Sequence, residues 1–241
     1  MDKKLGHVYR YHSRSDAHSI ELCRLIVADL VQRCTALRDQ AARGEVAYGI
    51  NLKHQFPSGK SKTLDLAIGI PRGRPIPGVA ASGIHQVDDL AEVLIACEAK
   101  TAMTEHGKAQ PRIFDELSSS HEIVHGGRAD AIAAGVTVVN IAASFVSPLR
   151  QRKGEVIYAS IHKQPHVTER MVNHLRGLVV RERPEGVGFD AYCTIVVDCD
   201  NQSQVSLWTT SPAPQAGDSD HYDTFVNRIA DFYTKRFSGI G

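Results

Sequence analysis

Acidic and basic side chains stand within or directly after two short apolar runs of this sequence. Asp65 lies in the run 63–68, and Glu98 and Lys100 follow the run 92–97. Two carboxylates supply the hard oxygen ligands that Mg²⁺ prefers, and an ammonium beside them can orient a water molecule and offset developing negative charge. Residues of these types in this order suit the metal-assisted hydrolysis of a phosphodiester bond.

Both runs have the composition of buried β-strands. Val, Leu, Ile and Cys crowd the run 92–97 after the turn signal at 88–89, which is typical of a central strand covered on both faces. Because burying an unpaired charge is costly, Glu98 and Lys100 should lie where this strand emerges into a cleft, beside other charges or a metal ion. Side chains alternate along a strand, so these two share a face, while Ala99 turns away and leaves its carbonyl available.

The arrangement resembles the PD-(D/E)xK nuclease superfamily, with the motif reading Leu64-Asp65 followed by Glu98-Ala99-Lys100. The resemblance covers roughly residues 45–145. No proline precedes Asp65, and a Pro/Gly-rich segment, 69–78, lengthens the interval before Glu98 and is expected to form a loop that reaches over bound DNA. The resemblance implies a restriction-endonuclease-like fold, with Mg²⁺, or Mn²⁺ as its substitute, bound by Asp65, Glu98 and the Ala99 carbonyl, and with Lys100 orienting the attacking water.

The function that this resemblance implies is a DNA endonuclease, of the type II restriction or phage-defence kind. Cutting double-stranded DNA requires two active sites or two visits, so a homodimer or higher homo-oligomer is expected. Nuclease relatives often take a further acidic residue from a helix before the sheet, for which Glu21 is the candidate; a solvated Glu21 is the alternative. Basic residues near the motif are candidate phosphate contacts or, alternatively, a solvated rim of charge: Lys60, Lys62, Arg72, Arg74, Lys108 and Arg112.

A second motif supports a rival function. His121-Glu122-Ile123-Val124-His125 satisfies H-E-x-x-H, which on a helix presents two imidazoles to zinc with the glutamate as general base of a metallopeptidase. Gly126-Gly127 would end that helix, and an incidental match is the alternative because the pattern fixes only three positions in a chain with 12 histidines. The third hypothesis is a noncatalytic nucleic-acid-binding or assembly protein in which Glu98 and Lys100 form a structural pair.

Hydrophobic periodicity and turn signals predict an α/β fold with a mixed central sheet flanked by helices. The segment 46–53 forms a hairpin with the Asp65 strand, and a helix over 104–117 tolerates Pro111 only if that residue lies in the first turn. The last helix carries an aromatic stripe assigned to the core, with a dimer interface as the alternative. The remaining predicted elements are a long helix over 15–43, strands over 131–143, 190–198 and 205–208, and helices over 167–178 and 220–237.

Composition bounds the remaining possibilities. The 241 residues suit one nuclease domain over 1–241, with a core at about 45–145, the N-terminal helix and a C-terminal extension over 155–241. A net charge of +1 gives no whole-chain attraction to nucleic acid, so any DNA-binding surface must be local. Five scattered cysteines, an odd number, predict reduced thiols of a cytoplasmic protein rather than a disulfide framework. No apolar run is long enough to cross a bilayer, and no membrane association is expected.

Overall fold

The central element is an eight-stranded mixed sheet with the strand order β12-β11-β8-β7-β4-β3-β6-β5. The computed structural model describes residues 2–4, 7–152 and 156–239. In chain order, the strands of this sheet are β3 (Ala47–Gln55), β4 (Ser61–Pro71), β5 (Pro75–Ala81), β6 (Ile84–Val87), β7 (Leu90–Ala102), β8 (Ile132–Asn140), β11 (Ala191–Asp198) and β12 (Ser206–Leu207). Two small antiparallel pairs stand apart from it: β1 (Asp2–Lys4) with β2 (His7–Tyr9), and β9 (Ser144–Phe145) with β10 (Ser160–Ile161).

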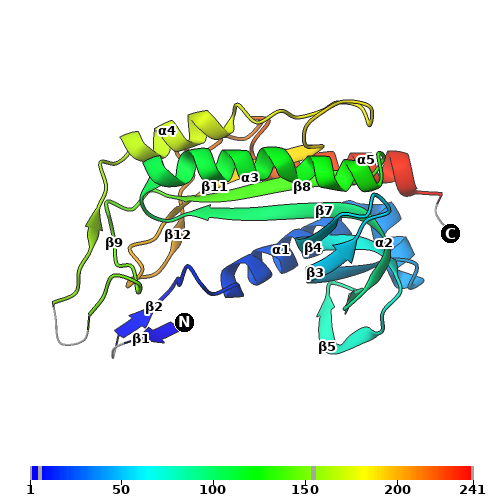
Figure 1. Ribbon diagram of the computed structural model, residues 1–241, viewed down its shortest axis with the longest axis horizontal. Coiled ribbons are helices and arrows are strands. Elements are labelled where there is room, and N and C mark those ends of the chain that lie inside the picture. The colour runs from blue at the N-terminus through cyan, green and yellow to red at the C-terminus, as the bar shows by residue number, and fades with distance from the viewer. Residues whose placement is uncertain (1, 5–6, 153–155, 240–241) are drawn as a thin grey trace.

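Helices cover both faces of the sheet, as Figure 1 shows with α3 and α4 on one side and α1 on the other. The helices are α1 (Ala17–Arg33), α2 (Thr35–Ala42), α3 (His106–Gly127), α4 (His166–Leu175) and α5 (Tyr222–Phe237). Residues of α1, α2 and α5 form one hydrophobic core with the sheet, and residues of α3 and α4 form the other. The predicted α/β class with a mixed sheet between helices is therefore confirmed.

Strand β7 lies in the middle of this sheet, antiparallel to β4 and parallel to β8. Its apolar residues divide between the two cores, with Leu94, Ile95 and Cys97 on the side of α1 and Val93 and Ala96 on the side of α3. Helix α3 connects β7 to the parallel strand β8, which makes an α/β crossover. The predicted hairpin is confirmed, because β3 pairs antiparallel with β4.

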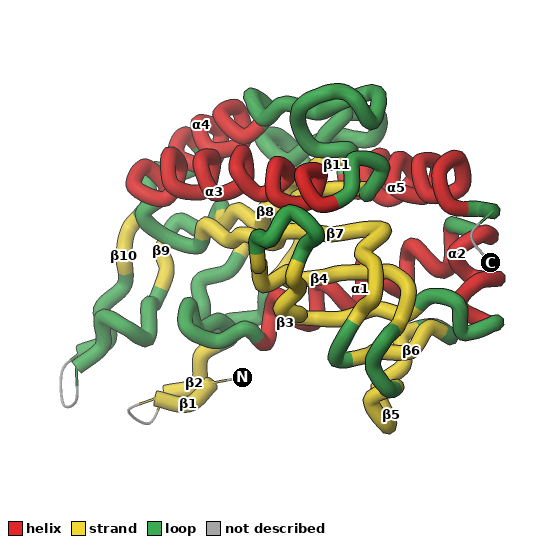
Figure 2. The backbone as a smooth tube through the Cα atoms, turned by 45° about the vertical axis from the view of Figure 1, so that its right-hand side comes forward, coloured by secondary structure: helices red, strands yellow, loops and turns green. Residues whose placement is uncertain are grey.

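Three predicted elements differ from the structure. The single helix over 15–43 is wrong, because Cys34 adopts φ −106° and ψ 101° and separates α1 from α2. The Pro/Gly-rich segment 69–78 is not a loop, since β4 continues to Pro71 and β5 begins at Pro75 and pairs with β6 at the sheet edge (Figure 2). Pro111 is the sixth residue of α3, one turn later than expected, and α3 runs on to Gly127.

The C-terminal third completes the central sheet rather than adding a separate layer. Strand β11 pairs in parallel with β8, and α5 buries Phe225, Ile229, Tyr233 and Phe237 in the core that it shares with α1. The predicted aromatic stripe is therefore core packing.

The cysteines of this protein agree with the prediction made from its sequence. All five cysteines are buried free thiols, as predicted. Across residues 2–4, 7–152 and 156–239, the structure contains no helix with the length and apolar character of a membrane span.

Candidate active site

The pairing of β4 with β7 brings Asp65 to the end of the Glu98 strand. The ladder matches Leu66 with Cys97 and Ala67 with Ala96, so continuing it by one residue sets Asp65 against Glu98. An Asp65 carboxylate oxygen accepts a hydrogen bond of 2.8 Å from the backbone N–H of Ala99. The Asp65 side chain thus takes the acceptor role that a backbone carbonyl has elsewhere in the ladder, and it lies against the Glu98–Lys100 backbone.

Glu98 is a buried carboxylate that contacts side chains from three elements. Lys62 of β4 lies 3.0 Å from its Oε2, and Lys100 of β7 lies 2.6 Å from its Oε1. The hydroxyl of Ser120 on α3 donates to Oε2 at 3.2 Å. Only 9% of Glu98 is exposed, so these partners compensate a charge that would be costly to bury alone.

Glu116 of α3 is a third carboxylate at this site, and the sequence analysis missed it. Its Oε2 lies 3.4 Å from Lys100 Nζ, and its Oε1 accepts a hydrogen bond of 2.9 Å from Arg112. Arg112, Glu116 and Ser120 recur at four-residue spacing, so they share one face of α3. That spacing is the only signal in the sequence, and it does not reveal which face of α3 meets β7.

Charge and burial shift the ionisation of three of these groups. Burial raises the pKa of Asp65, and the negative charge of Glu98 raises it further. The hydrogen bond from Ala99 and the positive charges of Lys100 and Lys62 lower this pKa, but they offset the rise only in part. Burial alone would lower the pKa of Lys100, but its hydrogen bond to Glu98 and the surrounding carboxylates raise it. For Glu116, burial is outweighed by Arg112 and Lys100, and its pKa is lowered. Lys100 is therefore a cation at neutral pH, suited to orienting a water molecule rather than to accepting its proton.

The oxygen atoms that could hold a small hard cation here are those of the Asp65 and Glu98 carboxylates and of the Ala99 carbonyl. The N–H and C=O of one strand residue point toward the same neighbouring strand, so the Ala99 carbonyl faces the side from which Asp65 approaches. Two carboxylates and this carbonyl fit Mg²⁺, which takes one or two protein carboxylates and fills its remaining positions with water and substrate phosphate. A closed metal centre is a different case: within the described residues, no group of three or more His, Cys, Asp or Glu could hold a metal ion.

The predicted basic residues separate into two groups. Lys62 and Arg112 contact Glu98 and Glu116 directly. Lys108 lies one turn before Arg112 and pairs with Glu105.

The other three basic residues lie away from these carboxylates. Lys60 is exposed beside the turn between β3 and β4. Arg72 and Arg74 follow the far end of β4, where Arg72 pairs with Asp89. Arg72 lies seven positions after Asp65, which is about 23 Å along an extended chain. The structure therefore does not bring Arg72 and Arg74 to the site.

Glu21 also lies away from the cluster. It pairs with Arg24 at 2.6 Å on α1, whereas the Ser120 and Glu116 contacts come from α3 on the opposite face of the sheet. The structure therefore assembles the additional carboxylate from the helix that follows the motif, not from the helix that precedes it.

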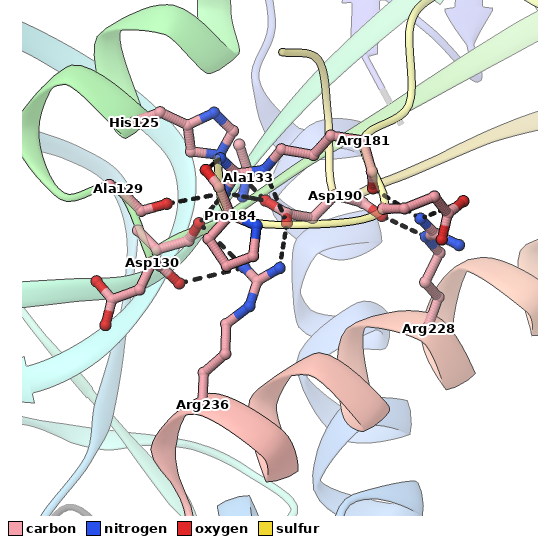
Figure 3. Close-up of polar contacts among 11 residues, drawn as sticks. His125, Ala129, Asp130, Ala133, Arg181, Pro184, Asp190, Arg228 and Arg236 are labelled. Atoms are coloured by element: carbon pink, nitrogen blue, oxygen red, sulfur yellow. Dashed lines mark hydrogen bonds and ion pairs between the residues drawn. The ribbon is translucent and has the colours of Figure 1, made fainter. Parts of the chain in front are cut away.

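The second histidine of the H-E-x-x-H motif, His125, contacts a buried ion-pair network (Figure 3). The rings of His121 and His125 are 5.9 Å apart, on one face of α3 as the motif predicts. His125 Nε2 lies 3.0 Å from a carboxylate oxygen of Asp190, which also accepts hydrogen bonds from Arg181 and Arg236. Since Asp190 is engaged by these two arginines, it is poorly suited to serve as the third zinc ligand.

A cleft of about 420 Å³ opens beside Lys100 and Glu116. Three parts of the chain line this cleft. They are the N-terminal segment at Tyr11 and Ser13, the end of β7 together with the start of α3, and the segment 145–150. The cleft gives the charged cluster an opening wide enough for a substrate.

Neither the protein-family models, nor the curated proteins, nor the solved structures compared with this chain give a match.

Proposed function

We propose that this protein is a Mg²⁺-dependent nuclease that hydrolyses phosphodiester bonds on a restriction-endonuclease-like sheet. The observation that carries the proposal is the contact of Asp65 with the Ala99 backbone, which sets one carboxylate beside a second, Glu98, and beside the ammonium of Lys100. A raised pKa at Asp65 and a buried charge at Glu98 are the properties of carboxylates that gain from a bound cation.

Each residue has a separate role in this reaction. Asp65, Glu98 and the Ala99 carbonyl would hold Mg²⁺, or Mn²⁺ in its place, and the ion supplies charge stabilisation for the attacked phosphate. Lys100 donates a hydrogen bond to the attacking water and fixes its position, because its ammonium is held between Glu98 and Glu116. Ser120 and Lys62 position the Glu98 carboxylate. The water oxygen forms a bond to phosphorus as the bond to the leaving oxygen breaks, and the proton that the water gives up passes to solvent, from which the leaving oxygen takes one.

The expected setting of the nuclease follows from the resemblance and from the thiols. The resemblance implies a restriction or phage-defence enzyme. It implies double-stranded DNA as the substrate and a homodimer as the assembly. Five buried free thiols support a reducing, cytoplasmic environment.

Cleavage of plasmid DNA, circular single-stranded DNA and RNA with Mg²⁺, with and without EDTA, tests the proposal. We expect cleavage that EDTA abolishes, and a loss of about 100-fold or more in Lys100→Ala, as when one transition-state donor is removed. Lys235→Ala, an exposed lysine of α5, is the matched control and should cleave like the wild type. If Lys100→Ala and the wild type are indistinguishable on all three substrates, the nuclease proposal is wrong.

A noncatalytic nucleic-acid-binding protein is the second candidate, because both Lys62 and Lys100 form ion pairs with Glu98. In that case the wild type binds nucleic acid without Mg²⁺-dependent cleavage, and Glu98→Gln lowers only the stability of the fold. The zinc peptidase finds no support in the geometry of His121 and His125. Zinc bound by the purified protein and lost in His121→Ala would reverse that judgement.

A further inference from the structure

The cleft beside Lys100 has the volume of a small-ligand pocket. Its volume of about 420 Å³ lies within the range of about 300–1,000 Å³ that such pockets have. A pocket of this kind can take a single nucleotide, and a base can stack on a side chain within it only when that base is unpaired.

A fixed aromatic ring lines the cleft. The Tyr11 hydroxyl is 2.8 Å from the hydroxyl of Thr101 on β7, and its ring packs against His18 at a centroid distance of 5.1 Å. The backbone of Tyr11 is held on both sides by Asn201, through a bond of 2.6 Å from the Tyr11 N–H and one of 2.9 Å to its carbonyl. A ring held in this way can stack on a base without further loss of conformational freedom.

Two arginines line the same cleft in contact with carboxylates. Arg112 pairs with Glu116, and Arg150 pairs with Glu105, which also accepts from Lys108 at 3.3 Å. Glu105 adopts φ 52°, a left-handed conformation that is uncommon for a glutamate, at the start of α3. Its carboxylate is bound by two cationic side chains, as a phosphate group would be.

We propose that this cleft binds an unpaired nucleotide, so that the substrate is single-stranded nucleic acid or a single-stranded end rather than a continuous duplex. The inference rests on the proposed nuclease function, and it replaces the double-stranded DNA substrate that the resemblance implies with an unpaired one. The base stacks on Tyr11, and the adjoining phosphate replaces the Glu105 carboxylate at Arg150. The scissile phosphate then lies at the Lys100 end of the cleft.

Fluorescence anisotropy in EDTA measures this binding without cleavage. The probes are a labelled oligothymidylate, an oligouridylate and a blunt DNA duplex of equal length; the first two distinguish DNA from RNA. We expect the better single strand to bind at least about tenfold more tightly than the duplex, because base stacking and one released arginine both contribute. Equal or tighter binding of the duplex would overturn the inference.

Four variants identify the contacts. Tyr11→Leu should weaken single-strand binding by at least about fivefold, and Tyr11→Phe, which keeps the ring, should not. Arg150→Ala should weaken single-strand binding and reduce the slope of log affinity against log salt concentration by about one. Glu105→Gln should strengthen single-strand binding, because it releases Arg150 from its ion pair. Arg74→Ala, at the distant sheet edge, is the control. Equal affinities for Tyr11→Leu and Tyr11→Phe, with equal melting temperatures, would remove the stacking role and the inference with it.

Cleavage in Mg²⁺ separates the two proposals. If the protein cuts closed circular duplex and prefers it over single strands, the nuclease stands and the unpaired-nucleotide cleft is wrong. If Tyr11 controls single-strand binding but no nucleic acid is cut in Mg²⁺, the cleft stands as a binding site and the nuclease is wrong.

Discussion

Replacing Asp190 should strongly destabilise this fold. The carboxylate is fully buried and accepts from Arg181 at 3.0 Å and from Arg236 at 2.7 Å through Oδ1. Its Oδ2 accepts from Arg181, from the backbone N–H of Ala133 and from His125, at 3.0, 2.9 and 3.0 Å (Figure 3). It thereby connects the end of α3, the segment before β11, and α5.

The structure supplies the magnitude. Asp190→Ala leaves Arg181, of which 3% is exposed, without its carboxylate, and breaking a buried ion pair from one side costs about 3–5 kcal/mol. That is a large share of the roughly 5–15 kcal/mol by which a domain is stable. Asp190→Asn keeps the shape and an acceptor for Ala133, so we expect a smaller loss of about 1.5–3 kcal/mol.

The pH dependence of stability gives an independent measure. Burial alone would raise the pKa of Asp190, but the hydrogen bonds from His125, Arg181 and Arg236 lower it to about 2. A carboxylate with a lowered pKa stabilises the fold above its unfolded pKa, near 3.9, and this contribution disappears as pH falls toward 2. Its size is about 2–3 kcal/mol, the equivalent of the shift at about 1.36 kcal/mol per pKa unit. The wild type should lose this much more stability than Asp190→Asn over that interval.

Urea unfolding, followed by circular dichroism at neutral and acidic pH, measures these losses. Asp115→Ala, an exposed aspartate of α3, is the matched control and should change stability by less than about 0.5 kcal/mol. A loss below about 1 kcal/mol in Asp190→Ala would refute the reasoning, because it would mean that the two arginines find water or other partners at little cost.

Two further substitutions probe the backbone around the site. Gly69→Ala should destabilise by at least about 1–3 kcal/mol, because an added Cβ would lie 1.9 Å from the carbonyl oxygen of Glu92 at a bulge between β4 and β7; thermal unfolding checks this, and an unchanged melting temperature would contradict it. Asn201→Ala should lose about 2–3 kcal/mol and free the N-terminal segment, because this fully buried side chain bonds both sides of Tyr11 and the carbonyl of Val146. Amide hydrogen exchange at 9–13 measures that release, and exchange as slow as in the wild type would disprove it.

The sequence by itself determined the strands and the motif they carry. Apolar runs of strand length predicted β4, β7, β8 and β11. A strand that is covered on both faces is apolar along its length, so its own residues are enough to reveal it. Asp65 and Glu98 followed from the same pattern, because each stands within or directly after one of these runs.

The tertiary structure decided which distant residues join these two carboxylates. The rotation of α3 about its axis places Glu116 and Ser120 on β7, and a four-residue spacing alone cannot specify that rotation. Asp190 meets His125 across 65 positions of sequence, because β11 pairs in parallel with β8. Arg72 stands apart from Asp65 because β4 continues through a segment whose prolines and glycines predicted a loop; edge pairing outweighed that local preference. Packing between faces, not local propensity, therefore sets the surroundings of the site.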